Sequence, residues 1–503
     1  MSIIKVENLT FSYPSSYDNI FENVNFQIDS DWKLGLIGRN GRGKTTFLNL
    51  LRGKLDYRGN IISSVQFDYF PYDIRDKSKM TTDILSEICP LAEEWELIRE
   101  LNYLELDAEV LYRPFETLSN GEQTKVLLAA LFRNEGHFLL IDEPTNHLDL
   151  HAREIVATYL NKKKSFILVS HDRCFIDNCV DHILSINKAD IEVQKGNFSS
   201  WWENRQRQDA LETATNEKLK KEINRLSEAA KRNAGWSDSV EKSKLGTTSS
   251  GSKLDRGFVG HKAAKMMKRS KVIEARQQQA IAQKSRLLKN HETVENLEVR
   301  PLTYHTDLLL RLSDVSIRYA QKTVCSSVSF EIRQGERIAL DGKNGSGKSS
   351  LLKLLTGSPI AYSGDLSIGS QLLISYVPQD TSFLKGSVSE YADACSIDKS
   401  LFMAILRKLG FQKIQFQKNM EDFSSGQKKK VLLARSLCEQ AHLYVWDEPF
   451  NFIDVYARMQ IEQLLKACAP TMIFVEHDKA FRELIATKII SLNEIKCNPY
   501  DSE

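Results

Sequence analysis

The chain has 503 residues, of which 42% are hydrophobic, and a formal net charge of +2 at pH 7. That length predicts two or more domains with cores of ordinary size. We find no run of about 18 uncharged apolar residues, as a membrane-spanning helix needs, and no secretory signal at the N-terminus. The eight cysteines form no C-x-x-C pair, which favours reduced thiols over disulfides or a metal site. We therefore expect a cytoplasmic protein.

Two phosphate-binding motifs stand about 300 residues apart: GRNGRGKT begins at Gly38 and GKNGSGKS begins at Gly342. Each fits G-x-x-x-x-G-K-[ST] after a short apolar stretch. The glycines let backbone N–H groups surround phosphate oxygens, the lysine reaches the terminal phosphates, and the next hydroxyl can bind Mg²⁺. The residues predicted to bind nucleotide here are Gly38, Asn40, Gly41, Gly43, Lys44, Thr45, Thr46, Gly342, Asn344, Gly345, Gly347, Lys348, Ser349 and Ser350.

The two loops belong to two copies of one domain, which we place at residues 1–200 and 306–503. Each copy alternates β-rich runs with helical stretches, which predicts an α/β fold. Further motifs follow in the same order in both copies. The first copy has Tyr13, then YFPY, LSNGE, DEPTNHLD and SHD, and the second has Tyr319, then YVPQ, FSSGQ, DEPFNFID and EHD.

This order resembles the ABC ATPase family, in which a phosphate loop, glutamine loop, signature, Walker B strand, D-loop and switch histidine follow one another. Two such cassettes joined by a long charged linker are similar to the ABC-F class in particular. The resemblance implies an ATPase that uses ATP and Mg²⁺. It also implies that the two cassettes pair head to tail within one chain, so we expect a monomer.

The resemblance also assigns roles to individual residues. The predicted catalytic residues, which act on the attacking water or the γ-phosphate, are Glu143, Glu448, His171 and His477. The predicted metal ligands are Thr45, Asp142, Ser349, Gln379 and Asp447. Ser424 and Gly426 are predicted to close the first site, and Ser119 and Gly121 the second. Tyr13 and Tyr319 are predicted to stack on adenine, with an ordinary strand aromatic as the alternative.

The first copy departs from the family pattern at the glutamine loop. Tyr72 stands where the second copy has Gln379. A phenol cannot imitate an amide that touches both metal and water, so we expect slower or differently gated hydrolysis at the first site. FSSGQ and FNFID in the second copy also differ from the common pattern. Both glutamates are present, and we therefore still expect two competent sites.

Residues 201–305 are predicted to form a basic linker. Residues 201–290 contain 21 Lys and Arg against 10 Asp and Glu, a net of +11, so the rest of the chain carries −9. Apolar spacing over 219–230 predicts a helix that ends near Trp236, and a seven-residue spacing predicts a second over 261–297. Residues 237–260, rich in Ser, Gly and Thr, are predicted to form the tip of an antiparallel helical hairpin.

Residues 261–271 carry six basic residues, counting His261, and no acid. Such a run can be a solvated helix face, or it can bind RNA phosphates while nearby apolar side chains meet unpaired bases. The tip residues predicted to make these contacts are Lys244, Lys253, Leu254 and Phe258. The ABC-F resemblance implies binding at the exit site of the bacterial ribosome, with rRNA and P-site tRNA as partners and no DNA or membrane.

WKLGLIGRNGRGKTT, LDYRG and MKRSK look like the Lsa-type antibiotic-resistance branch of ABC-F. That branch protects ribosomes against lincosamides, streptogramin A compounds and pleuromutilins. The expected function is therefore to dislodge drug through the linker tip, with release on ATP hydrolysis. The alternatives are a general translation factor that rescues stalled ribosomes, the ATPase subunit of a membrane transporter and, most weakly, a chromosome-maintenance ATPase.

Overall fold

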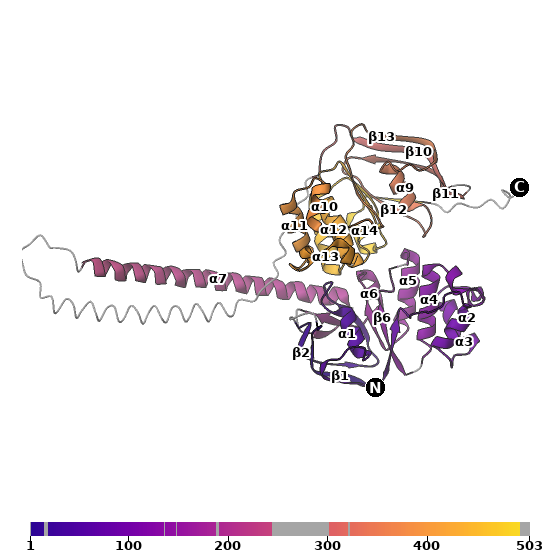
Figure 1. Ribbon diagram of the computed structural model, residues 1–503, viewed down its shortest axis with the longest axis horizontal. Helices are drawn as coiled ribbons and strands as arrows, with labels where there is room; N and C mark the ends of the chain where they lie inside the picture. The colour runs from indigo at the N-terminus through magenta and orange to yellow at the C-terminus, as the bar shows by residue number, and fades with distance from the viewer. Residues whose placement is uncertain are drawn as a thin grey trace, which may run out of the picture. The chain divides into compact units, whose positions relative to one another are not determined.

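The computed structural model describes residues 2–14, 19–134, 136–146, 148–187, 191–243, 301–319 and 322–492. The chain divides into two units, Met1–Trp201 together with Val294–Glu503, and Trp202–Thr293. The first unit contains two α/β cassettes (Figure 1). No helix among the described residues is both long and apolar enough to cross a membrane.

The first cassette contains two sheets. One is antiparallel in the order β2-β1-β4 and is built from Phe21–Asp29, Ile3–Phe11 and Arg58–Ile62. The other has six strands in the order β5-β6-β7-β3-β8-β9: Gln66–Phe70, His137–Asp142, Phe166–Val169, Lys33–Ile37, His182–Ile186 and Ile191–Lys195. Its first five strands run parallel, and only β9 is antiparallel to its neighbour.

Among the described residues of this cassette, six α-helices and two 3-10 helices accompany these sheets. The α-helices are α1 Lys44–Leu51, α2 Thr81–Ile88, α3 Glu94–Tyr103, α4 Asn120–Leu131, α5 Leu150–Asn161 and α6 Arg173–Cys179. The 3-10 helices are Ala108–Tyr112 and Phe115–Thr117. The parallel strands are short apolar runs such as FILV in β7, which is buried along its whole length. Such runs are typical of parallel strands that are covered on both faces.

The second cassette repeats this plan. Its antiparallel sheet has the order β11-β10-β13: Lys322–Arg333, Leu308–Tyr319 and Tyr362–Ile368. Its parallel sheet has the order β14-β15-β16-β12-β17: Ile374–Val377, Leu443–Asp447, Met472–Val475, Arg337–Asp341 and Lys488–Ser491. The helices are α9 Lys348–Leu355, α10 Val388–Ala394, α11 Lys399–Lys408, α12 Ser425–Cys438, α13 Val455–Cys468 and α14 Lys479–Ile485, with 3-10 helices Gln415–Gln417 and Met420–Asp422. The predicted α/β fold with two cassettes is confirmed.

The register of the parallel strands brings the motifs together. In the first cassette Phe70 at the end of β5 pairs with Ile141 of β6, and in the second Val377 of β14 pairs with Trp446 of β15. The glutamine-loop segments therefore leave both sheets beside the acidic residues. Because the carboxyl ends of parallel strands meet at one edge, the phosphate loops after β3 and β12 begin at that same edge.

Helix α7, Phe198–Ser243, begins in the first unit and continues into the second. Its first part agrees with the predicted linker helix, but it runs seven residues beyond the predicted end near Trp236. The run SDSVEKS over 237–243 contains neither Gly nor Pro, so nothing in it interrupts the helical hydrogen bonds. The predicted second helix and the rest of the tip lie outside the described residues.

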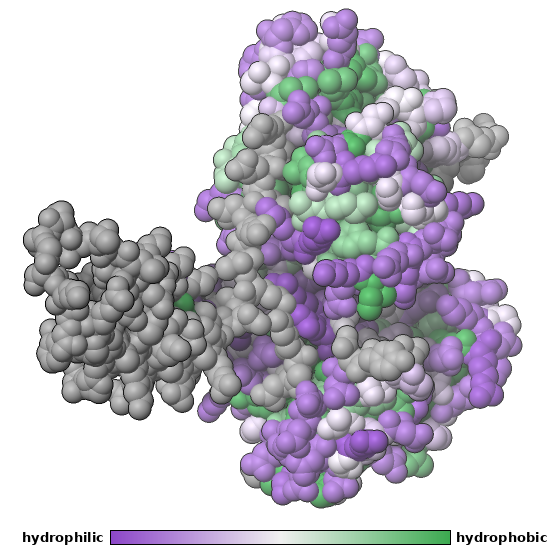
Figure 2. Space-filling view, turned by 60° about the vertical axis from the view of Figure 1, so that its left-hand side comes forward, coloured by the Kyte–Doolittle hydropathy of each residue, from purple (hydrophilic) through white to green (hydrophobic). Residues whose placement is uncertain are grey.

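The outer surface of the cassettes is largely polar. In Figure 2, hydrophilic side chains cover much of the coloured surface, and hydrophobic ones gather in smaller groups. The apolar residues instead form the interior, where Trp446, Tyr444 and Phe474 are at most 2% exposed. These cores hold the strands whose carboxyl ends carry the predicted site residues.

Candidate functional site

Each phosphate loop ends at a glycine that caps the following helix. Gly43 precedes α1 with φ of 92°, and Gly347 precedes α9 with φ of 88°. Side chains rarely adopt this left-handed region. A Cβ on Gly43 would lie 2.6 Å from Ile20 Cγ2, and one on Gly347 would lie 3.0 Å from Cys325 Cβ. Both positions therefore require glycine for conformation and for space.

The two loop lysines lie against their own loops. Lys44 Nζ donates to the carbonyl of Gly38 at 2.8 Å, and Lys348 Nζ donates to that of Gly342 at 2.6 Å. Burial lowers the pKa of Lys44, although nearby acids, Asp454 first among them, oppose this shift. Each ammonium thus lies at the N-terminus of a helix, where free N–H groups and the helix dipole favour a bound phosphate.

A hydroxyl and a carboxylate meet beside each loop. Thr45 Oγ1 donates to Asp142 Oδ2 at 3.1 Å, and Ser349 Oγ donates to Asp447 Oδ1 at 3.2 Å. Asp447 Oδ2 is buried and has no hydrogen-bond partner among the described residues. Mg²⁺ prefers oxygen ligands and usually keeps waters and substrate phosphates in its coordination shell. The donor set therefore fits the predicted cation, which would neutralise phosphate charge there.

The two predicted catalytic glutamates share an unusual backbone. Glu143 has φ of 53° and Glu448 has φ of 46°, a strained region for a residue with a side chain. The Glu143 N–H donates to the carbonyl of Val169 at 2.9 Å, and the Glu448 N–H donates to that of Val475 at 3.0 Å. Both bonds tie the glutamate to the strand that ends two residues before the predicted switch histidine.

In the second site, the Glu448 carboxylate is held by donors. Oε2 accepts from Gln379 Nε2 at 2.8 Å and from Asn451 Nδ2 at 2.5 Å. His477 Nε2 lies 3.7 Å from Oε1. Burial opposes ionisation of this carboxyl, but His477, Gln379 and Asn451 outweigh it and lower the Glu448 pKa to about 2. The side chain is therefore an ionised acceptor at neutral pH.

In the first site, the corresponding carboxyl has fewer donors. His171 Nε2 lies 3.1 Å from Glu143 Oε1, and Tyr72, in place of glutamine, is 38% exposed. Burial, together with the charge of Asp142, raises the Glu143 pKa to about 8. Burial and the charge of Lys44 push the His171 pKa well below its ordinary value. The first glutamate and histidine therefore form a neutral pair near pH 7.

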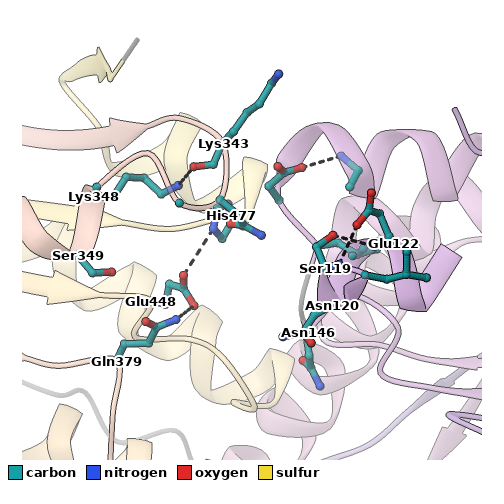
Figure 3. A pocket seen from close by; sticks show the side chains of 18 of the residues that line it. Ser119, Asn120, Glu122, Asn146, Lys343, Lys348, Ser349, Gln379, Glu448 and His477 are labelled. Carbon is teal, nitrogen blue, oxygen red and sulfur yellow. Dashed lines mark hydrogen bonds and ion pairs between the residues drawn. The ribbon is translucent and has the colours of Figure 1, made fainter. Parts of the chain in front are cut away.

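A pocket of about 890 Å³ lies between the phosphate loop of the second cassette and the signature of the first. Figure 3 shows Gln379, Glu448 and His477 on one wall and Ser119 and Glu122 opposite them. The predicted residues that line it are Ser119, Gly121, Asn344, Gly345, Gly347, Lys348, Ser349, Ser350, Gln379, Glu448 and His477. The structure therefore brings together the two walls predicted for the second site.

Each signature serine begins a helix. Ser119 caps α4 and Ser424 caps α12, and each hydroxyl accepts from a backbone N–H three residues later at 3.3 Å. Glu122 and Gln427 complete capping boxes by accepting from the serine N–H groups. Both signatures thus place a helix N-terminus at the cassette interface, where it can meet phosphate.

The first site is closed by direct contacts between the cassettes. Asn40 Nδ2 donates to the carbonyl of Phe452 at 2.8 Å, and the Asn40 N–H donates to Asp454 Oδ2 at 3.4 Å. A Cβ on Gly426 would lie 2.4 Å from the Phe452 carbonyl oxygen and 3.1 Å from Asn40 Nδ2. Asp454 also pairs with buried Lys430 at 2.8 Å. The loop of the first cassette therefore meets the signature and D-loop of the second.

The two tyrosines predicted to stack on adenine are partly exposed. Tyr13 is 38% exposed, and its hydroxyl lies 2.9 Å from Thr46 Oγ1 at the start of α1. Tyr319 ends β10 and is 45% exposed. Tyr13 is thus adjacent to the first phosphate loop, and stacking stays a prediction for both.

The residues predicted at the linker tip lie outside the described residues: Lys244, Lys253, Leu254 and Phe258.

The structure adds two residues that sequence patterns did not indicate. Lys429 is buried, and its ammonium donates to the carbonyls of Pro378 at 2.9 Å and Asp447 at 3.3 Å, while burial lowers its pKa to about 8. Glu476 accepts from the N–H groups of Phe450 and His477 at 2.8 and 2.9 Å. The first copy has Thr124 and Ser170 at the equivalent positions. This difference between the two copies is the sequence signal that could have identified Lys429 and Glu476.

The family model described as "ABC transporter" matches residues 21–146 and 325–451, which is half of the chain. The chain is 27% identical to the ribosome protection protein VmlR of Bacillus subtilis, over 96% of this chain and 86% of VmlR. It is 23% identical to the energy-dependent translational throttle protein EttA of Haemophilus influenzae, over 95% of this chain and 89% of EttA. These relatives are ABC-F proteins, the class that the sequence resembles.

A solved structure of a similar fold contains the archaeal ribosome recycling factor aABCE1 in complex with the ribosomal stalk protein aP1. It aligns with a TM-score of 0.62 at 18% identity, over 96% of this chain and 87% of that chain. A structure titled "RNase-L Inhibitor" aligns with a TM-score of 0.58 at 19% identity, over 96% of this chain and 87% of that chain. The chain therefore belongs to the ABC transporter family, as an ATPase with two ATP-binding domains in tandem.

Proposed function

We propose that the chain is a cytoplasmic, monomeric ABC-F ATPase that binds the bacterial ribosome in its ATP-closed state. It protects the ribosome from antibiotics of the lincosamide, streptogramin A and pleuromutilin type, which act at the peptidyl-transferase centre. The linker tip dislodges the drug, and ATP hydrolysis releases the protein. The observation that carries the proposal is the pairing of each phosphate loop with the signature of the other cassette.

That pairing supports an ATP-dependent clamp. Phosphate held by Lys348 and the α9 N-terminus would also meet the N-terminus of α4 across the pocket. Attraction from both helix ends would hold the cassettes together while the γ-phosphate is present. Mg²⁺ at the Ser349 and Asp447 oxygens would balance the remaining phosphate charge. Loss of the γ-phosphate would weaken the clamp and let the cassettes separate.

The proposed hydrolytic step uses residues that the fold has already oriented. Ionised Glu448 can accept a proton from the attacking water, while Gln379 and Asn451 hold its carboxylate in place. His477, two residues after β16, lines the same pocket and can donate a hydrogen bond to phosphate. Glu143 and His171 occupy the matching places in the first site. The reaction is the hydrolysis of ATP to ADP and phosphate.

Ribosome binding is supported by charge and by the relatives. The net charge of +11 over residues 201–290 contrasts with −9 elsewhere, so a polyanion would attract the linker far more than the cassettes. VmlR is named as a ribosome protection protein and EttA as a translational throttle protein. We infer that Lys244, Lys253, Leu254 and Phe258 act on the drug site, directly or through rRNA and P-site tRNA.

Co-sedimentation with bacterial ribosomes tests the partner. The Glu143→Gln, Glu448→Gln double variant should bind ATP, hydrolyse it poorly and pellet with ribosomes only when ATP is present. The matched control adds Lys44→Ala and Lys348→Ala, which should abolish the ATP-dependent fraction. If the variant binds ATP but does not bind ribosomes, the ribosomal proposal is wrong, and the transporter-subunit alternative becomes the leading one.

Drug protection is tested separately, in cells exposed to the three antibiotic classes. Lys44→Ala or Lys348→Ala should abolish resistance. Phe258→Ala and Leu254→Ala should change the drug spectrum while ATPase activity remains near that of the parent. Two results together would instead indicate a general factor for stalled ribosomes. Cells that lack the protein would be as drug-resistant as cells that have it, and they would grow more slowly in medium without drug.

A further inference from the structure

The first turn of α7 is anchored by an aromatic contact between the cassettes. Trp201 is 5% exposed, and its ring meets the Tyr456 ring edge to face, with centroids 6.3 Å apart and an interplanar angle of 83°. Phe198 of the same turn lies 5.7 Å from the Trp201 ring. Trp201 and Phe198 follow the first cassette, whereas Tyr456 belongs to α13 of the second. The start of the linker helix therefore depends on a side chain from the opposite cassette.

The same tyrosine also contacts the first phosphate loop. The Arg39 guanidinium lies over the Tyr456 ring at 5.5 Å from its centroid, within cation–π range. Tyr456 stands two residues after Asp454, whose carboxylate accepts from the N–H of Asn40. The ring thus contacts both a cation of the first phosphate loop and the Trp201 indole of the linker helix. If the cassettes separate at the first site, Tyr456 loses its contacts with Arg39 and Trp201 at the same time.

The equivalent place at the second site is built differently. His151 corresponds to Tyr456 by its position after the D-loop aspartate, and Lys343 corresponds to Arg39. The His151 side chain is 69% exposed, and its Nε2 lies 3.5 Å from Glu105 Oε2. Helix α7 follows the first cassette. The aromatic contact with the linker is therefore a property of the first site.

We propose that Tyr456 is a positioning residue that couples closure of the first ATP site to the first turn of α7. When that site is closed, Arg39 and Trp201 both contact the ring, and the ring in turn supports Trp201. When the site opens, the first turn of α7 loses this aromatic contact. The linker helix then senses the nucleotide state of the first site specifically. The inference requires ATP binding and cassette closure but not a ribosome.

Hydrogen–deuterium exchange of the full chain tests this coupling. The parent is the Glu143→Gln, Glu448→Gln variant, compared with and without Mg-ATP, and the readout is exchange in peptides that begin at Phe198. ATP should slow exchange there at least threefold. Tyr456→Phe, which keeps the ring, should preserve the effect, and Tyr456→Ala should remove it. His151→Ala, the matched substitution at the second site, should preserve it.

ATP affinity is measured for every variant with a fluorescent ATP analogue, and exchange is compared at saturating ATP. If Tyr456→Ala keeps the ATP-dependent slowing, the coupling does not exist. If His151→Ala removes the slowing as well, the effect reports general closure, and the assignment to the first site is wrong. If Tyr456→Ala no longer binds ATP, the ring is part of the nucleotide site, and its proposed role as a coupling residue is wrong. Failure to bind ribosomes affects none of these outcomes.

Discussion

Glu448 in the second site and Glu143 in the first directly follow equivalent strands and share a left-handed backbone, yet their side chains have different neighbours. His477 and the amides of Gln379 and Asn451 hold Glu448 and keep it ionised. Glu143 has a neutral histidine beside it, and its pKa is raised to about 8. The comparison teaches that one motif, repeated in one chain, gives different chemistry when the side chains around it differ.

The largest expected difference between the sites concerns the glutamates themselves. Glu448→Gln should lower ATP turnover about a hundredfold, because the remaining glutamate is mostly protonated at pH 7 and also lacks the glutamine-loop amide, and each factor contributes about tenfold. Glu143→Gln should lower turnover about twofold or less. Steady-state phosphate release measures both. Equal losses would show that the two sites hydrolyse ATP equally.

Substitution of the glutamine-loop residues should have the next largest effect on turnover. In the Glu448→Gln background, Tyr72→Gln should raise turnover at the first site about tenfold, because a hydrogen bond to a charged group contributes about 1.5 kcal/mol. The reciprocal control, Gln379→Tyr in the Glu143→Gln background, should lower turnover at the second site by a similar factor. Unchanged turnover in Tyr72→Gln would mean that the tyrosine is merely tolerated.

The pH dependence should separate the sites by a smaller factor. A general base works only when ionised, and Glu143 ionises as pH rises through about 8. Turnover of the Glu448→Gln variant should therefore rise about fivefold between pH 7.4 and 9. Glu448, with a pKa of about 2, is ionised throughout, so the Glu143→Gln variant should stay flat. A flat profile in both variants would remove protonation of Glu143 from the explanation.

Loss of two ion pairs that follow the switch histidines should change the stability of the protein rather than its activity, and the two changes should differ in size. Arg173 pairs with Glu462 at 2.5 Å in a mostly buried place, whereas Lys479 pairs with Glu154 at 3.3 Å with both side chains at least half exposed. Arg173→Ala should lower the free energy of unfolding by about 3 kcal/mol or more, because it leaves a buried carboxyl unpaired. Lys479→Ala should cost less than about 1 kcal/mol. Denaturant unfolding measures both, and equal losses would contradict the difference in burial.

Much of the architecture could be predicted from the sequence. The repeated motif order indicated two α/β cassettes, and the strand registers explain why motifs far apart in sequence meet at one edge. Contacts that depend on packing between the copies could not be predicted in this way. Lys429 and Tyr456 lie within helical runs, and their sequence positions do not reveal which groups they contact. The end of α7 was also missed, because a polar run without Gly or Pro can continue a helix.

The length of α7 gives small rotations a large effect. Its 46 residues form an unbroken helix, and at 1.5 Å per residue this corresponds to about 69 Å. If the helix behaves as a rigid lever, a tilt of about 5° at its first turn displaces its other end by about 6 Å. A rearrangement at Trp201 too small to alter the cassette cores would thus be amplified along the helix. The chain could in this way convert the chemistry of one phosphate group into mechanical displacement.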